Sequence, residues 1–175
     1  MADETPKLVL VGPVGAGKTT LLGSITGTPP ISTEMPLTDG ATADKTTTTV
    51  ALDFSSVSLD DDVSLLVYGV PGQSHFSFMR PILLDGALGA ILVLNGTDPE
   101  LVSHCDYWLD EILGTHKDMP VVVGITHTDI NPGFDLCRIR DRVRRRRASI
   151  PVFTLDVRRR DHSIHLVRAL LTAAR

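Results

Sequence analysis

Short apolar segments recur along the chain, and stretches with helical spacing separate them. Five of the segments are continuous apolar runs of strand length, at residues 7–11, 63–68, 88–94, 121–125 and 150–155. Such runs are typical of strands that are covered on both faces. Residues 50–59 alternate more clearly, which favours an edge strand joined to the next strand by a hairpin through Asp60, Asp61 and Asp62.

Helical patterns fill the intervals between these runs. Asp98 and Asp161 are suited to cap helices, and apolar residues follow each of them at three- and four-residue spacing. Strands that alternate with helices indicate an α/β fold with a mostly parallel sheet and helices on both faces. We expect about six strands, one of them an antiparallel edge strand, and about five helices. The segment 27–49 carries no clear pattern and is predicted to be a long surface loop.

Composition narrows the class of protein. The length of 175 residues is typical of one domain, so residues 1–175 are predicted to form a single domain. Apolar residues make up 42% and charged residues 22%, which argues against disorder. The chain has no apolar run long enough to span a membrane, no signal-like N-terminus and only two cysteines. These features predict a cytoplasmic location.

A glycine-rich loop follows the first apolar run and precedes a helical pattern. Its sequence, Gly12-Pro13-Val14-Gly15-Ala16-Gly17-Lys18-Thr19, has the G-x-x-x-x-G-K-T spacing of a phosphate-binding loop. Glycines lack a Cβ, so backbone N–H groups can close around a polyphosphate. Lys18 can bridge the β- and γ-phosphates, and Thr19 can offer its hydroxyl to Mg²⁺. The predicted phosphate-binding residues are Gly12, Val14, Gly15, Ala16, Gly17, Lys18, Thr19 and Thr20.

Two further motifs make the chain resemble Ras-like small GTPases, in particular the prokaryotic branch of MglA and conservon-type GTPases. One is the threonine run Thr46-Thr47-Thr48-Thr49, and the other is Val70-Pro71-Gly72-Gln73 before an apolar helix. The resemblance covers residues 8 to about 171. It implies a three-layer P-loop NTPase fold of the Ras-like type, a GTP/GDP molecular switch, GTP hydrolysis and a Mg²⁺ cofactor.

The same resemblance implies roles for residues in two switch segments. Thr49, with Thr48 as the alternative, would bind Mg²⁺ and the γ-phosphate together with Thr19. The N–H of Gly72 would meet the γ-phosphate, and Gln73 would be the catalytic residue that orients the attacking water.

The base-recognition motif is altered but recognisable. Thr126-His127-Thr128-Asp129 stands where the family has N-K-x-D. The Asp129 carboxylate can accept hydrogen bonds from N1–H and the amino group of guanine, and His127 can stack on the ring. Asp156, Val157 and Arg158 stand where the family has S-A-K, and the Arg158 stem can cover the base. Guanine is favoured, with adenine or mixed specificity as the alternative.

The sequence departs from the Ras pattern in switch II and in the phosphate loop. Gly69 replaces an aspartate that supports Mg²⁺, which predicts weak Mg²⁺ affinity. Val14 replaces a glycine and would hinder an arginine inserted by a partner, while Arg80 is a candidate for an arginine acting within the chain, or else a packing residue. We therefore expect slow intrinsic hydrolysis, stimulated by a partner that repositions Gln73. The alternatives are a non-hydrolysing nucleotide-binding scaffold and, less favoured, a P-loop kinase with an arginine-rich lid.

Charge is distributed unevenly along the chain. Residues 1–130 hold 5 Lys/Arg against 17 Asp/Glu, and residues 131–175 hold 12 against 4, which together give the net charge of −4. Ten arginines lie between Arg138 and Arg160. They predict either a solvated face or a basic surface for an acidic partner or an anionic membrane, the latter placing the protein at the inner membrane face. The stretch has no nucleic-acid-reading module, so no nucleic acid is expected.

The resemblance also implies protein partners. GTPases of the prokaryotic branch work with regulatory proteins of the roadblock/LC7 class, and effectors bind the switch segments.

Overall fold

The computed structural model describes residues 5–37, 48–60 and 63–174. They form a sheet of seven strands in the order β2-β3-β4-β1-β5-β6-β7. The strands are β1 (Lys7–Val11), β2 (Ile31–Leu37), β3 (Thr48–Asp60), β4 (Val63–Gly69), β5 (Gly89–Asn95), β6 (Val121–Thr126) and β7 (Val152–Thr154). The helices are α1 (Lys18–Thr26), α2 (Met79–Leu84), α3 (Leu101–Thr115), α4 (Leu136–Arg146) and α5 (Arg160–Ala173). Two short 3₁₀ turns occupy Ser74–Phe76 and Thr128–Ile130.

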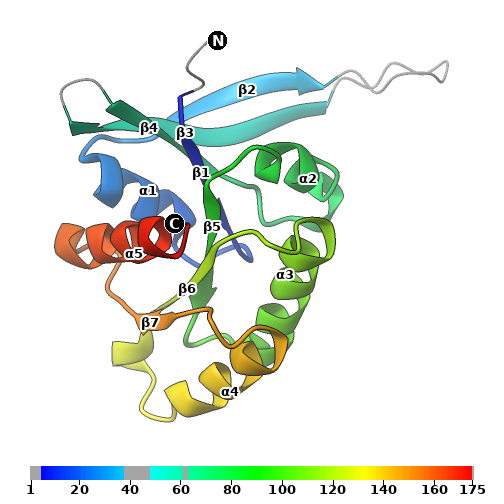
Figure 1. The fold of residues 1–175 in the computed structure, drawn as a ribbon, viewed down its shortest axis with the longest axis vertical. Helices are drawn as coiled ribbons and strands as arrows, with labels where there is room; N and C mark the ends of the chain where they lie inside the picture. Colours follow the sequence, from blue (N-terminus) through cyan, green and yellow to red (C-terminus); the bar gives the residue numbers. More distant parts are fainter. Residues whose placement is uncertain (1–4, 38–47, 61–62, 175) are drawn as a thin grey trace, which may run out of the picture.

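Helices cover the sheet on both faces, with α1 and α5 on one side and α2, α3 and α4 on the other (Figure 1). Alternation of side chains along β1 supplies both cores. Val9 and Val11 pack in the core with α3 and α4, and Leu8 and Leu10 pack in the core with α1 and α5. This two-sided burial explains the continuous apolar runs and confirms the three-layer α/β fold with helices on both faces.

The antiparallel part of the sheet differs from the expectation. β3 is the one antiparallel strand within the described residues, as predicted, but it is not at the edge, because β2 pairs with it on its outer side. β2 lies inside the segment 27–49, which was predicted to be a loop. In the sequence Ile-Ser-Thr-Glu-Met-Pro-Leu, Ile31, Met35 and Leu37 alternate with polar residues and a proline, but proline is unfavourable in a strand, and the segment pairs with β3 along its whole length.

Two helix starts also differ from the prediction. Asp98 was expected to cap α3 directly, but α3 begins at Leu101, and the Asp98 carboxylate instead accepts a hydrogen bond from the Glu100 N–H at 2.8 Å. Asp161 lies in the first turn of α5 rather than at its cap, which is Arg159. No helix in the described ranges has the length and apolar character needed to cross a membrane.

Candidate functional site

A cavity of about 520 Å³ opens at the edge of the sheet where β1 and β4 end. Parallel strands present their carboxyl ends at one edge, and ligands of open α/β sheets bind there. The cavity is lined by the loop after β1, the start of α1, the end of β4 with the segment after it, one residue of β3 and one residue after β6. The lining residues are Val14, Gly15, Gly17, Lys18, Thr19, Thr20, Asp53, Gly69, Val70, Pro71, Gly72, Gln73 and His127.

The glycine-rich loop closes around the N-terminus of α1. Gly17 caps this helix with φ of 98°, a left-handed conformation that favours glycine. The first turn of α1 therefore borders the cavity, and the N-terminus of a helix is suited to bind an anion. The Lys18 ammonium donates hydrogen bonds to the carbonyls of Gly12 at 2.8 Å and Pro13 at 2.7 Å, so the loop backbone holds its charge at the cavity wall.

Burial lowers the pKa of Lys18 to about 8, and the nearby Asp53 carboxylate offsets part of this effect. The charged form is therefore disfavoured in the folded chain relative to the usual value of 10.5. The free-energy cost of burying the charged ammonium therefore lowers the stability of the fold. This cost is fully present below pH 8 and fades as the pH rises from about 8 to 10.5. A bound polyphosphate would favour the charged form again.

Binding of a nucleoside diphosphate is therefore expected to take up about half a proton per site at pH 8, because about half of the Lys18 side chains are neutral at a pH equal to their pKa. The measurement is calorimetry of GDP binding at pH 8 in two buffers with different ionisation enthalpies. The affinity should also fall about tenfold between pH 7 and pH 9. Binding without net proton uptake at pH 8 would contradict the proposed contact.

Asp53 is a residue of the candidate site that the sequence did not single out. Its Oδ2 accepts a hydrogen bond of 2.5 Å from the hydroxyl of Thr19. The register of β3 against β4 places Asp53 directly opposite Gly69, and a Cβ added at Gly69 would lie 3.3 Å from the Asp53 Cβ. Asp53, which is paired with Gly69 across the two strands, thus brings to the site a carboxylate that Gly69 lacks. The only sign of Asp53 in the sequence was a carboxylate within an otherwise apolar part of β3.

The segment after β4 lies directly on the glycine-rich loop. A Cβ added at Gly72 would lie 2.6 Å from the backbone nitrogen of Val14, so only glycine fits at this approach. Gln73 follows at the cavity wall, is exposed, and its carbonyl accepts a hydrogen bond from the Phe76 N–H at 3.2 Å. The structure therefore brings Gly72 and Gln73 to the glycine-rich loop, and the roles given to them at the γ-phosphate stay predictions.

A second cavity of about 280 Å³ adjoins the first, and both are lined by Gly17, Thr20 and His127. Its wall includes all the residues predicted to recognise the base, namely His127, Asp129, Asp156, Val157 and Arg158. The Arg158 guanidinium donates two hydrogen bonds to Asp156, at 2.8 and 2.7 Å, and holds the pKa of that carboxyl at about 2. Asp129 is exposed at the cavity.

Thr126 lies in the wall of the second cavity and ties it to the glycine-rich loop. It is 1% exposed, and its hydroxyl lies 3.0 Å from the carbonyl of Ala16 in the glycine-rich loop and 2.7 Å from Nδ1 of His127. His127 adopts a φ of 55°, which is uncommon for a residue other than glycine. The sequence predicted no role for Thr126. Its structural role is to fix the loop after β6 to the glycine-rich loop.

The structure does not bring Thr49 to Thr19. Thr46 and Thr47 lie outside the described residues, as do the side chains of Thr48 and Thr49. The backbone of Thr49 belongs to β3, where it is paired with Pro36 of β2. It is four residues before Asp53, or about 13 Å along the strand. Mg²⁺ binding by Thr49 stays a prediction that requires the start of β3 to move.

Arg80 is a packing residue, so the alternative in which it acts on the nucleotide is not supported by its position. It is 3% exposed, and Nη1 donates to the Tyr107 hydroxyl at 2.6 Å and to Glu111 at 2.9 Å. Its guanidinium carbon lies 4.1 Å from the centre of the Trp108 ring, within cation–π distance. Arg80 thereby fastens α2 to α3.

Comparison with known proteins also indicates a Ras-like GTPase domain. Residues 7–129 match the family model described as "Ras of Complex, Roc, domain of DAPkinase". The GTP-binding protein YPTM2 of Zea mays is 28% identical over 113 residues, which are 63% of this chain and 50% of the maize protein. The Ras-related protein Rab-7b of Mus musculus is 32% identical over 123 residues, 67% of this chain and 56% of the mouse protein.

An archaeal relative is matched over more of its length. An uncharacterized protein of Methanocaldococcus jannaschii is 28% identical over 130 residues, 74% of this chain and 75% of the archaeal protein. The chain spans about half the length of the maize and mouse relatives. The family match covers the glycine-rich loop, Asp53, the Gly72 segment and Asp129. The chain therefore belongs to the Roc family of Ras-like GTPase domains, a family of GTP-binding switches.

Proposed function

We propose that this chain binds GTP and GDP in the two adjoining cavities, hydrolyses GTP slowly and acts as a molecular switch. The observation that carries the proposal is the pair of cavities joined at Gly17, Thr20 and His127, with Lys18 in one and Asp129 in the other. The first cavity presents an ammonium and a helix N-terminus to phosphate groups. The second presents a carboxylate that suits the N1–H and amino donors of guanine.

The donor set at Thr19 fits Mg²⁺, which prefers oxygen ligands and usually binds through one or two protein groups together with substrate phosphates. The Thr19 hydroxyl and the Asp53 carboxylate are in contact at 2.5 Å. We propose that Thr19 holds the ion and that Asp53 supports it in place of the aspartate missing at Gly69. When bound, Mg²⁺ would neutralise phosphate charge. Weak Mg²⁺ affinity stays the prediction from Gly69, and support from Asp53 would make the affinity higher than Gly69 alone suggests.

Slow hydrolysis follows from what lines the phosphate cavity. Lys18 is its only Lys or Arg among the described residues, and Arg80 is engaged by α3. Gln73 is left to orient water without an arginine to stabilise the developing charge, and an arginine is worth about 10³–10⁵ in rate. Val14, 65% exposed at the cavity, would obstruct an arginine from outside. We propose that a partner of the roadblock/LC7 class repositions Gln73.

We further propose that the chain belongs to the prokaryotic MglA or conservon-type branch, because it has the threonine run and Gly69. The P-loop kinase alternative is weakened because Arg146 and Arg147, in the arginine stretch that would form its lid, bond to α3 and to the loop after it. Only a measurement of phosphate release from GTP distinguishes the switch, which hydrolyses GTP, from the alternative of a non-hydrolysing scaffold.

The test combines base specificity with turnover. The purified chain is expected to bind GDP and GTP and to release phosphate from GTP slowly. Asp129→Asn should lower guanine-nucleotide affinity about 10- to 100-fold, because a bidentate acceptor becomes a group that places an N–H against a guanine donor. It should improve binding of xanthosine diphosphate, whose base carries an acceptor there. Calorimetry with both nucleotides measures this, and Asp118→Asn, an exposed residue on no cavity wall described above, is the matched control. Tighter binding of ADP than GDP by the unmodified chain would contradict the proposal.

A further inference from the structure

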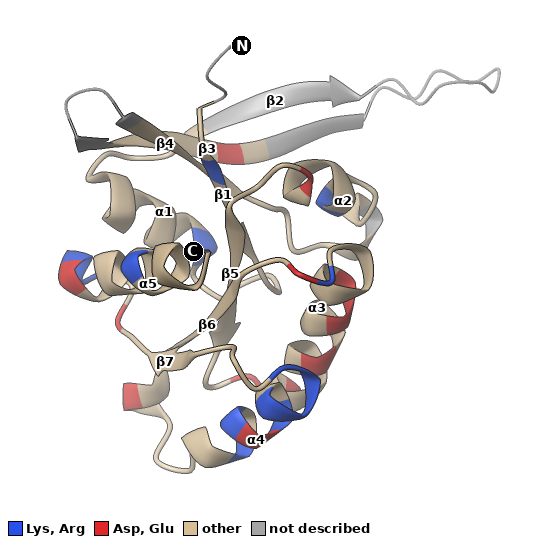
Figure 2. Ribbon diagram, in the orientation of Figure 1, with Lys and Arg blue, Asp and Glu red and all other residues tan. Residues whose placement is uncertain are grey.

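Five arginines on and just after α4 form two sets with different surroundings. Arg142, Arg146 and Arg147 face the α3 side of α4. Arg142 pairs with Asp106, and Arg146 pairs with Asp110 at 3.0 Å and with Asp106 at 3.2 Å. Figure 2 shows this row of basic residues on α4 beside acidic residues on α3. Arg142 and Arg146 thus fasten α4 to α3, and Arg147 donates to the carbonyls of Lys117 and Met119 after α3. All three are engaged within the chain.

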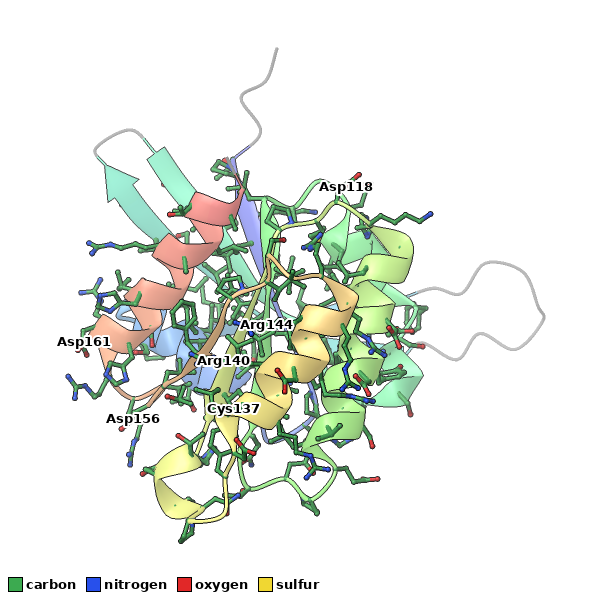
Figure 3. All side chains as sticks on the ribbon, turned by 60° about the horizontal axis from the view of Figure 1, so that its bottom comes forward. Asp118, Cys137, Arg140, Arg144, Asp156 and Asp161 are labelled. Atoms are coloured by element: carbon green, nitrogen blue, oxygen red, sulfur yellow. The ribbon has the colours of Figure 1, made fainter. Side chains whose placement is uncertain are left out.

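Arg140 and Arg144 lie on a different flank of the same helix, one turn apart and both exposed (Figure 3). They line a cavity of about 400 Å³ between α4 and β7, which we call the α4–β7 groove. The rest of its lining is residues 148–153, which contribute Ser149, Ile150 and Phe153. The lining contains no carboxylate. The nearby Asp156 is already paired with Arg158, at 2.7 Å. Two positive charges thus border a hollow without a neutralising partner in its wall.

β7 forms one edge of the sheet, and no strand within the described residues pairs with its outer side. The Pro151 carbonyl and the Leu155 N–H bond to β6, both at 3.0 Å. Because strand residues alternate, the backbone groups of Val152 and Thr154 face outward. The Val152 carbonyl receives only a long contact of 3.4 Å from the Arg140 guanidinium. The edge therefore offers backbone hydrogen bonds beside the two arginines.

We propose that the α4–β7 groove binds an acidic, extended segment of a partner protein, which adds a strand to the free edge of β7. Main-chain bonds would join it to Val152 and Thr154, and alternate side chains would supply specificity. Carboxylates on one side of the added strand would pair with Arg140 and Arg144. Apolar side chains on the other side would cover Phe153, which is 40% exposed.

A protein segment suits this surface better than a lipid headgroup layer. The two guanidiniums border a concave space, and a planar membrane cannot reach backbone groups at the edge of a strand. The exposed Arg145, on the same helix but outside the groove lining, provides the matched comparison. A purely electrostatic attraction would depend on Arg145 as much as on the two groove arginines.

The experiment measures binding of a fluorescent peptide of alternating glutamate and valine to the full chain loaded with GDP. Arg140→Glu combined with Arg144→Glu should weaken binding at least about tenfold, since two attractions become repulsions, whereas Arg145→Glu should change it less than about twofold. Thr154→Pro, which removes one outward N–H at an edge position that tolerates proline, should also weaken it. Unchanged GDP affinity and circular dichroism confirm that each variant is folded.

Amide shifts in the isotope-labelled chain provide the second measurement. The peptide should shift the Thr154 amide first, and a peptide of alternating lysine and valine should not. The proposal is overturned if the groove variants bind the acidic peptide as well as the unmodified chain does, or if no binding occurs at millimolar peptide. Arginine-dependent binding to phosphatidylserine vesicles that the acidic peptide does not displace would assign the groove to a membrane and also overturn it.

Discussion

Lys18→Ala is expected to lower the affinity for GDP and GTP about 100- to 1,000-fold. Lys18 is the only Lys or Arg in the described wall of the phosphate cavity, and burial makes its contact with phosphate strong. Truncating one member of a buried charged pair removes about 3–4 kcal/mol of binding free energy, and each 1.4 kcal/mol is about tenfold in affinity. Titration calorimetry with GDP measures the loss directly.

The thermal stability of the nucleotide-free Lys18→Ala variant should not fall for electrostatic reasons, because burial of this ammonium opposes folding at pH 7. A large drop in the melting temperature would instead indicate general unfolding. Lys117→Ala removes the same charge from an exposed position and is expected to leave GDP affinity unchanged. If the Lys18 variant bound GDP within about fivefold of the unmodified chain, the glycine-rich loop would not be the phosphate site.

Asp53→Asn is expected to raise the Mg²⁺ concentration needed for tight nucleotide binding about 10- to 100-fold, the effect of losing a group that supports a metal ligand. The substitution keeps the shape of the side chain and removes the negative charge beside Thr19. Nucleotide affinity measured in excess chelator should change little, so the effect is specific to the metal. The measurement is a Mg²⁺ titration of nucleotide dissociation rates.

A double substitution distinguishes a role in metal binding from a structural one. Asp53→Ala combined with Gly69→Asp moves the carboxylate to the paired position on β4, since the two residues are opposite each other in the sheet. The double variant should recover part of the Mg²⁺ dependence that Asp53→Ala alone loses. Equal Mg²⁺ requirements in the unmodified chain and in Asp53→Asn would refute the role given to Asp53.

The features that sequence predicted are those encoded locally. The glycine-rich loop has its glycines, lysine and threonine at fixed spacing, and the buried strands β1, β5 and β6 are continuous apolar runs. The base-side residues Asp129 and Arg158 were predicted from the resemblance of two short motifs to the family's N-K-x-D and S-A-K sequences. Each of these signals resides within a few consecutive residues, so no knowledge of pairing was needed.

The features that sequence missed depend on contacts between distant residues. β2 is a strand because β3 pairs with it, and Asp53 belongs to the site because the register of β3 places it opposite Gly69. Likewise, the run Arg144–Arg147 is uniform in sequence, yet Arg146 reaches carboxylates on α3 while Arg144 lines a groove. Register and helix orientation decide these roles, and neither can be read from one stretch of chain.

The attachment of Arg80 between Trp108 and Glu111 has a consequence for how the chain responds to its ligand. Gly72 contacts the glycine-rich loop at one end of the segment, and Arg80 of α2 is held against α3 at the other. Gln73 therefore belongs to a short arc anchored at both ends. A conformational change that the nucleotide causes must therefore bend the chain within this arc. A rigid-body movement of the whole of α2 would separate the buried Arg80 guanidinium from its partners on α3.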